Sequence, residues 1–183
     1  MRTKNIKIIT LLCLLITTFF VLNYFFPEYK NKKINKNIMK LSSPAFQNEE
    51  NIPSEYTCNG ENINPPLEIK DVPATTKSLV LIMDDPDAPG GTWLHWSLWN
   101  IPSATKNIER NSIPQKAVLG TNDFNIIKYK GPCHPSGTHR YFFRLFALDT
   151  ILDLPEGSEI STLKEKIKNH IIDQTELIGT YSN

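Results

Sequence analysis

Prolines limit the fold of this chain more than any other feature of its sequence. Twelve of the 13 prolines lie between residues 44 and 155, at intervals of no more than 20 residues. Proline lacks the backbone N–H of a helical turn and its ring clashes with the preceding turn, so this spacing breaks long helices. The same spacing suits short strands joined by turns. We therefore expect a mostly β fold.

Three segments have the composition of buried strands. Residues 78–83 are continuously apolar or small, residues 93–101 carry three tryptophans, and residues 140–148 are rich in aromatic side chains. Aromatic and β-branched residues favour strands. We expect these three segments to be central strands of a β-sandwich.

One segment late in the chain has helical spacing. In residues 158–177 the apolar side chains Ile160, Leu163, Ile167 and Ile171 follow one another at intervals of three and four. This period predicts one face of a helix. Ser158 or Ser161 can cap its start and Gly179 can end it, so we expect one C-terminal helix covering an edge or an end of the sandwich.

The N-terminal part has the pattern of a membrane anchor. Residues 1–7 are basic, and residues 8–26 contain no charge and would span about 28 Å as a helix. We expect an uncleaved transmembrane signal anchor, followed by a Lys/Asn-rich linker at 27–40 and a folded domain at 41–183. This organisation predicts a membrane-anchored protein with its domain outside the cytoplasm, in the periplasm or at the cell surface. The alternative is secretion after cleavage of the signal.

The charge balance of the domain argues against nucleic acid as a partner. Residues 41–183 carry 12 basic and 18 acidic side chains. A domain with a net negative charge does not attract a polyanionic backbone. Any anion that it binds must be held by a local group of donors.

Two segments place polar residues beside the expected strands. In residues 84–96 a strand ends in Asp85, two prolines stiffen the turn that follows, and His95 begins the next strand. In residues 130–141 glycines permit close backbone approach, and His139 and Tyr141 open the third strand. Imidazole, phenol and backbone N–H groups together would make a small anion pocket, in which Asp85 holds the second nitrogen of one imidazole.

Other chemistries fit these segments poorly. A calcium loop starting at Asp85 needs an acidic twelfth residue, but that position is Trp96. A zinc site built from the histidines of the two segments follows no familiar spacing. The G-x-S-x-G elbow of serine hydrolases is absent from the sequence. We therefore expect no catalytic residues, no metal and no cofactor.

Three motifs in this order carry a family resemblance. They are Asp85-Pro-Asp-Ala-Pro89, Trp93-x-His95-Trp96 and the segment Gly131-Pro-x-x-Pro-Ser-Gly-Thr-His139-Arg-Tyr141. With them the sequence from about residue 41 onward closely resembles the phosphatidylethanolamine-binding protein family, in its bacterial and archaeal Raf kinase inhibitor-like branch. The resemblance implies a β-sandwich of two antiparallel sheets with flanking helices and a small anion pocket at one end.

The resemblance also assigns residues. It implies a pocket formed by Asp85, His95, His139 and Tyr141, with Pro89 and Gly131 at its rim. It further suggests that Asp87 and Arg140 form a buried structural pair that braces the two loops. Cys58 and Cys133 flank the same loops, and the sequence leaves open whether they form a disulfide or stay reduced.

For function, the resemblance implies a binding or regulatory module rather than an enzyme. Members of the family are described as binders of lipid head groups and as inhibitors of kinases or proteases. We expect a non-catalytic, membrane-tethered module that recognises a phosphate-like group or phospholipid head group, with an unidentified kinase or protease as a further candidate partner. The alternative is a hydrolase or metal-dependent phosphotransferase that uses the same Asp and His residues.

Overall fold

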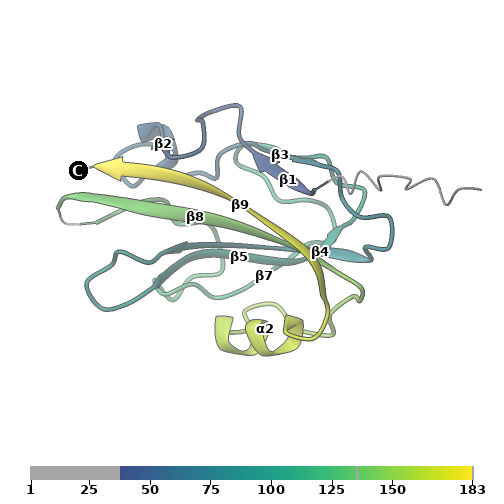
Figure 1. Cartoon of the computed structure of the whole chain (residues 1–183). Coiled ribbons are helices and arrows are strands. Elements are labelled where there is room, and N and C mark those ends of the chain that lie inside the picture. Colours follow the sequence, from purple (N-terminus) through teal and green to yellow (C-terminus); the bar gives the residue numbers. More distant parts are fainter. Residues whose placement is uncertain (1–37, 135, 183) are drawn as a thin grey trace, which may run out of the picture. The chain divides into compact units, whose positions relative to one another are not determined.

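The computed structural model describes residues 38–134 and 136–182, which form two β-sheets and one α-helix (Figure 1). The small sheet has three strands, in the order β1 (Lys40–Ser42), β3 (Leu67–Lys70) and β6 (Asn107–Ile108). The large sheet has six, in the order β2 (Glu50–Asn51), β9 (Ile171–Ser182), β8 (Thr138–Leu148), β4 (Ser78–Asp85), β5 (Trp93–Pro102) and β7 (Val118–Leu119). A short 3-10 helix (Ser54–Tyr56) and the helix α2 (Ile160–Ile167) complete the elements.

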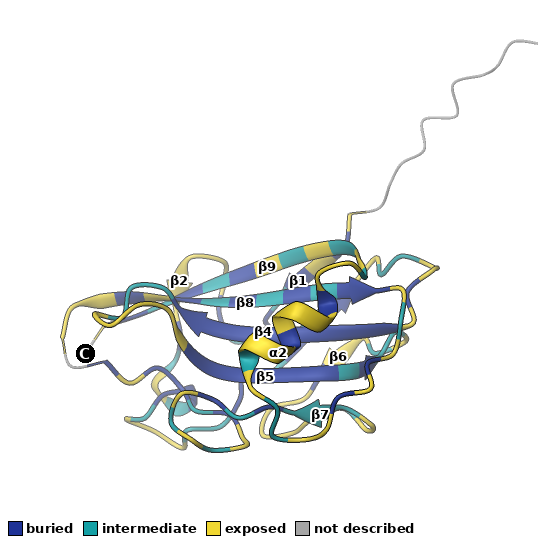
Figure 2. Ribbon diagram, turned by 90° about the horizontal axis from the view of Figure 1, so that it is seen from below, coloured by how far each residue is buried: buried dark blue, intermediate teal, exposed yellow. Residues whose placement is uncertain are grey.

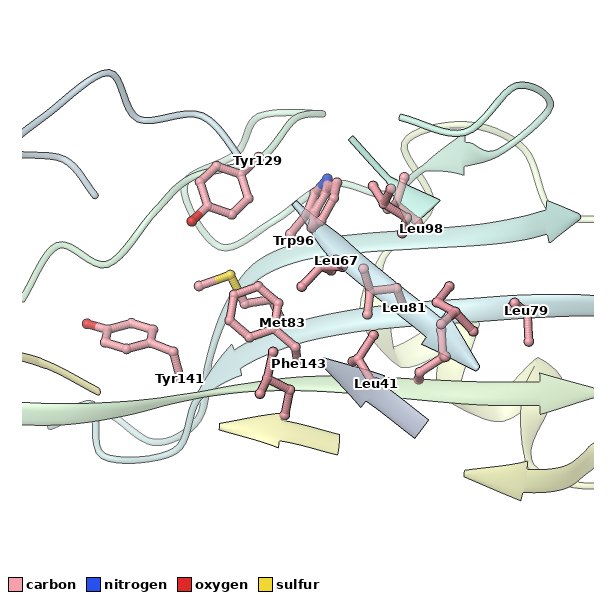
Figure 3. Packing of buried hydrophobic residues seen from close by; sticks show 14 of the residues in the cluster. Leu41, Leu67, Leu79, Leu81, Met83, Trp96, Leu98, Tyr129, Tyr141 and Phe143 are labelled. Atoms are coloured by element: carbon pink, nitrogen blue, oxygen red, sulfur yellow. The ribbon is translucent and has the colours of Figure 1, made fainter. Parts of the chain in front are cut away.

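The three expected strands are confirmed as neighbours in the middle of the large sheet. β4 pairs antiparallel with both β5 and β8. Side chains alternate between the two faces of a strand, and in β4 this places Leu79, Leu81 and Met83 in the core toward the small sheet. Figure 3 shows this core, to which Leu41 and Leu67 contribute from β1 and β3.

The opposite face of the large sheet is covered by α2 (Figure 2). Val80 and Ile82 of β4 pack there in a second apolar cluster with Leu163 and Ile167 of the helix. Leu163 and Ile167 are four residues apart, so they lie on the same side of the helix. Both faces of β4 are therefore buried, which explains its uninterrupted apolar sequence.

The expected helix over 158–177 is wrong beyond residue 167. The helix ends at Ile167, and after a turn at 168–170 the chain enters β9, which runs antiparallel to β8. Glu159, rather than either serine, occupies the N-cap position, and Ser158 Oγ instead donates to the carbonyl of Pro155 at 2.6 Å. Gly179 lies within β9, where a Cβ would collide with Ile52.

Two details of the expected sandwich also change. The sheets are not purely antiparallel, because β2 pairs with β9 in parallel. The folded part begins before residue 41, since Met39 is fully buried and β1 starts at Lys40.

The expected location in a membrane is corrected. Within residues 38–134 and 136–182, no helix is long and apolar enough to cross a bilayer. The segment 8–26, on which that expectation rested, lies outside the described residues. We therefore withdraw the prediction of a membrane-anchored, extracytoplasmic domain.

Candidate functional site

The candidate site lies at the end of the large sheet where β4 and β9 finish and β5 and β8 begin, near the end marked C in Figure 1. Antiparallel pairing brings these strand ends together, with Asp85 opposite Trp93 and Asp84 opposite Phe142. His95 and His139, close to the starts of their strands, therefore meet the carboxylate that ends β4.

Asp85 and His139 form a buried pair. Nδ1–H of His139 donates to Oδ2 of Asp85 at 2.7 Å, and the two side chains are 11% and 4% exposed, respectively. Oδ1 of Asp85 accepts the backbone N–H of Asp87 at 2.9 Å. With both of its oxygens engaged, the carboxylate has a fixed position, and it orients the ring of His139.

The tautomer of His95 follows from its partner. Its Nδ1 lies 2.7 Å from the carbonyl oxygen of Lys130, which can only accept, so Nδ1 carries the proton. Burial lowers the pKa of His95 below its ordinary value, which favours the neutral ring. In that ring Nε2 is an acceptor. The edge-on rings of Phe124 and Tyr141, with centroids at 5.3 Å and 5.2 Å, fix its plane.

His134 forms a second layer behind His139. The two imidazoles are stacked, with centroids 4.2 Å apart and planes 10° apart. Nε2–H of His134 donates to the carbonyl of Gly137 at 3.0 Å. In the neutral ring Nδ1 then accepts the phenolic proton of Tyr141, at 2.8 Å. Burial and the nearby charge of Asp85 raise the pKa of Tyr141, so the phenol keeps its proton.

These groups surround a cavity of about 240 Å³. Trp93, 39% exposed, and Phe124 meet edge to face at a centroid distance of 5.6 Å and supply aromatic surface. The lining residues are Asp85, Ala88, Pro89, Gly90, Trp93, His95, Phe124, Cys133, His134 and His139. The cavity thus combines imidazole, carboxylate and aromatic groups.

Two residues expected at the pocket lie just behind its wall. Tyr141 is fully buried and directs its hydroxyl to His134. Gly131 donates its N–H to Asn62 Oδ1 at 2.8 Å, and a Cβ at this position would collide with the backbone of Tyr56. Gly131 therefore holds the segment that supplies the Lys130 carbonyl, rather than contacting the cavity itself.

The ion pair of Asp87 and Arg140 forms, but it is not buried. Nη2 of Arg140 lies 2.7 Å from Oδ1 of Asp87, and Nε and the backbone N–H of Arg140 both donate to Oδ2. The side chains are 56% exposed for Arg140 and 29% for Asp87. The hydrogen bonds from Arg140 lower the pKa of Asp87 to about 2. The pair links the β4–β5 turn to the start of β8.

Cys58 and Cys133 are joined by a disulfide, with their Cα atoms 5.4 Å apart. The backbone N–H of Cys58 also donates to the carbonyl of Pro132 at 3.0 Å. Because Cys133 lines the cavity, the disulfide ties one wall of the site to the loop that follows the 3-10 helix.

No cluster of three or more histidine, cysteine, aspartate or glutamate side chains suited to a metal ion occurs in the described part of the chain. Asp85 and His139, which line the cavity, are already hydrogen-bonded to each other, with His139 as the donor.

Sequence reasoning missed several parts of the site. Phe124 and Trp93 carry its aromatic surface, and the Lys130 carbonyl sets the His95 tautomer. Phe124 had no local signal, since it lies 29 residues along the chain from His95 in a stretch without a motif. The sequence shows that His134 lies within the motif from Gly131 to Tyr141. It does not show that the His134 ring stacks on His139.

Comparisons with known proteins identify one family. The phosphatidylethanolamine-binding protein family model matches residues 42–182. A UPF0098 protein of Methanothermobacter thermautotrophicus is 48% identical over 148 residues, which are 78% of this chain and 98% of that protein. A UPF0098 protein of Aquifex aeolicus is 44% identical over 151 residues, 79% of this chain and 88% of that protein.

Solved structures give the same result. The crystal structure of a putative phosphatidylethanolamine-binding protein homologue, CT736 from Chlamydia trachomatis, superposes with a TM-score of 0.78 at 41% identity, covering 80% of this chain and 99% of that one. YbcL of E. coli, described as a member of the mammalian family, has a TM-score of 0.75 at 28% identity, covering 79% and 98%. The chain therefore belongs to the phosphatidylethanolamine-binding protein family.

Proposed function

We propose that this protein is a non-catalytic binding module whose cavity at the end of the large sheet takes a small ligand bearing a phosphate-like group, such as the phosphate monoester of a phospholipid head group, phosphoethanolamine. The observation that carries the proposal is the way both imidazoles are held. His95 and His139 each use Nδ1 for a fixed partner, the Lys130 carbonyl and the Asp85 carboxylate. Each ring thus offers Nε2 to a ligand.

The two Nε2 atoms have different roles in this proposal. His139 in its protonated form donates Nε2–H to a phosphate oxygen, and its charge is stabilised by Asp85 at 2.7 Å. Neutral His95 accepts a hydrogen bond through Nε2, and the donor can be the P–OH group of a singly protonated phosphate. The carboxylate of Asp85 repels a fully ionised group. These three features favour a phosphate monoester that retains one proton over sulfate, which has none near neutral pH.

The aromatic side chains that line the cavity suit the organic part of such a ligand. Trp93 is partly exposed beside Phe124, and Lys130 Nζ lies 5.8 Å from the centroid of the Phe124 ring. An aliphatic or aromatic group attached to the phosphate can pack on these rings while the phosphate reaches the imidazoles. Among ligands with the same head group, affinity therefore rises with the apolar area next to it.

Calorimetric titration of the full chain with phosphoethanolamine tests the site. A hydrogen bond from a charged donor contributes about 1.5–3 kcal/mol, so His139→Ala should weaken binding by about one to two orders of magnitude. Sulfate should bind at least about tenfold more weakly than phosphate, the equivalent of one lost hydrogen bond.

His170→Ala is a matched control. His170 also holds an aspartate through Nδ1, Asp149 at 2.8 Å, but both side chains are about half exposed on a distant turn. This substitution should leave phosphoethanolamine binding unchanged. Equal losses from the two substitutions would contradict the proposed site.

Hydrolysis of p-nitrophenyl phosphate, with and without added divalent cations, tests the non-catalytic part of the proposal. We expect no turnover above background. Turnover that disappears in Asp85→Ala would identify the protein as a hydrolase instead.

A further inference from the structure

A second, larger cavity of about 410 Å³ lies beside the segment 128–131, and none of its lining residues borders the first cavity. Its apolar wall is formed by Ile63, Ile113 and Leu119 with the rings of Trp96 and Tyr129. Ile113 is 42% exposed. Trp96 follows His95 in β5, so adjacent side chains of one strand face the two cavities.

The indole N–H of Trp96 is the key observation. The side chain is 1% exposed, yet no acceptor within residues 38–134 and 136–182 is hydrogen-bonded to Nε1. Trp99, in the same strand, shows the usual arrangement, because its Nε1 donates to the carbonyl of Leu154 at 3.1 Å. A buried donor without an acceptor is unfavourable and rare in folded proteins.

An acceptor for this N–H can come from the cavity side. In Figure 3 the nitrogen of Trp96 lies on the part of the ring turned away from Leu67 and Met83, which belong to the apolar core. The side chains of those neighbours carry no oxygen that could accept. The side chain also lines the cavity. Nε1 itself is closed off from solvent, so a group that enters the cavity becomes its partner when the indole ring shifts slightly toward it.

Two polar side chains at this cavity, Asn62 and Lys128, offer donors to a ligand. Oδ1 of Asn62 already accepts the Gly131 N–H, which leaves its amide NH₂ for a ligand. The carboxylate of Glu61 also lines the cavity and shares Arg110 with Glu55, at 3.3 Å and 2.9 Å. Lys128 is exposed at the rim and adds a positive charge.

We propose that this second cavity binds a small organic acid. Its carboxylate accepts hydrogen bonds from the Trp96 indole and the Asn62 amide and is attracted by Lys128, while its hydrocarbon part packs on Ile63 and Ile113. This site is independent of the anion site at His95 and His139 and takes a different class of ligand, an apolar monocarboxylate.

A ¹⁵N-labelled sample of the full chain can report on the site directly. The chain has three tryptophans, and their indole N–H groups give three separate signals in a proton–nitrogen correlation spectrum. During titration with hexanoate, the Trp96 signal should move downfield as its proton gains an acceptor. The Trp99 signal should stay in place, because its donor is already used. Hexylammonium, which has the same chain but no acceptor, should leave all three signals unchanged.

Two substitutions sharpen the test. Trp96→Phe removes the donor and should weaken hexanoate binding about tenfold or more, as expected for a hydrogen bond to a charged group. Lys128→Gln changes only an exposed side chain and should weaken it by up to about fivefold, the range of a solvent-exposed ion pair. Lys106→Gln, another exposed lysine away from both cavities, is the matched control.

Three results would overturn the proposal. The first is a Trp96 signal that does not respond to hexanoate, which would mean that this donor stays closed off from the cavity. The second is an equal response to hexylammonium. The third is a response confined to Trp93, which would place the carboxylate in the histidine cavity.

Discussion

Removal of the Cys58–Cys133 disulfide should lower the free energy of unfolding by about 3–4 kcal/mol. The two cysteines are separated by 75 positions in the sequence. For a loop of this length, the chain-entropy model gives a stabilisation of about 4.5 kcal/mol at 25 °C. We expect somewhat less, because an unfolded chain retains some structure and so gains less freedom when the crosslink is removed.

Equilibrium urea unfolding, followed by tryptophan fluorescence, measures this loss. The comparison is between the wild-type chain and the double variant Cys58→Ser, Cys133→Ser. With a slope of about 2 kcal/mol per molar urea, the midpoint should fall by about 1.5–2 M. Cys13→Ser removes the third cysteine of the chain and leaves the disulfide intact, so its midpoint should equal that of the wild type.

A shift of less than about 0.5 M in the double variant would refute the entropic reasoning. So would a wild-type protein that, unfolded without reductant, reacts as though all three cysteines were free thiols. The two outcomes have different meanings. Three free thiols would show that the disulfide does not form, whereas a small urea shift would show that it forms but stabilises the fold little.

Two further predictions concern the loops that frame the site. Asp87→Asn should lower the free energy of unfolding at pH 7 by about 1 kcal/mol, a value reduced for the exposure of Arg140. Because the pKa of Asp87 is depressed to about 2 from an ordinary 3.8, this contribution is complete above about pH 4 and is lost as the pH falls through 2. Urea unfolding at pH 7 and pH 2 should therefore show a difference between variant and wild type only at pH 7. Gly131→Ala should cost about 1–3 kcal/mol, since its Cβ would press on the Tyr56 backbone; an unchanged thermal midpoint would contradict this.

The central strands were predictable because their signal is local. β4 is buried on both faces, so its sequence alone carries a continuous apolar run. The family motifs likewise placed Asp85, His95 and His139 at one end of the sandwich, and the structure brings them to one cavity.

The helix predicted over residues 158–177 is replaced by β9 in its second half because of contacts that are distant in the sequence. The helical spacing that begins at Ile160 continues to Ile171, but residues 171–182 instead complete the large sheet beside β8. In the strand, Leu177, Gly179 and Tyr181 are buried at every second position. Backbone pairing with β8 outweighs a local helical preference, and no local pattern reveals that partner.

The details of the site were hidden for the same reason. The roles of the two His95 ring nitrogens depend on a carbonyl 35 residues away along the chain. The unpartnered nitrogen of Trp96 depends on the absence of an acceptor within the described residues around it. Neither property belongs to a residue type or a spacing.

The position of β9 also has a consequence for how the protein is made. β9 lies between β8 and β2, and it follows the end of β8 by a connection that includes α2. At about 5–20 residues per second, a ribosome needs roughly 2–7 s to add the residues from 148 to 182. During that time β8 is an open sheet edge, able to pair with another nascent chain.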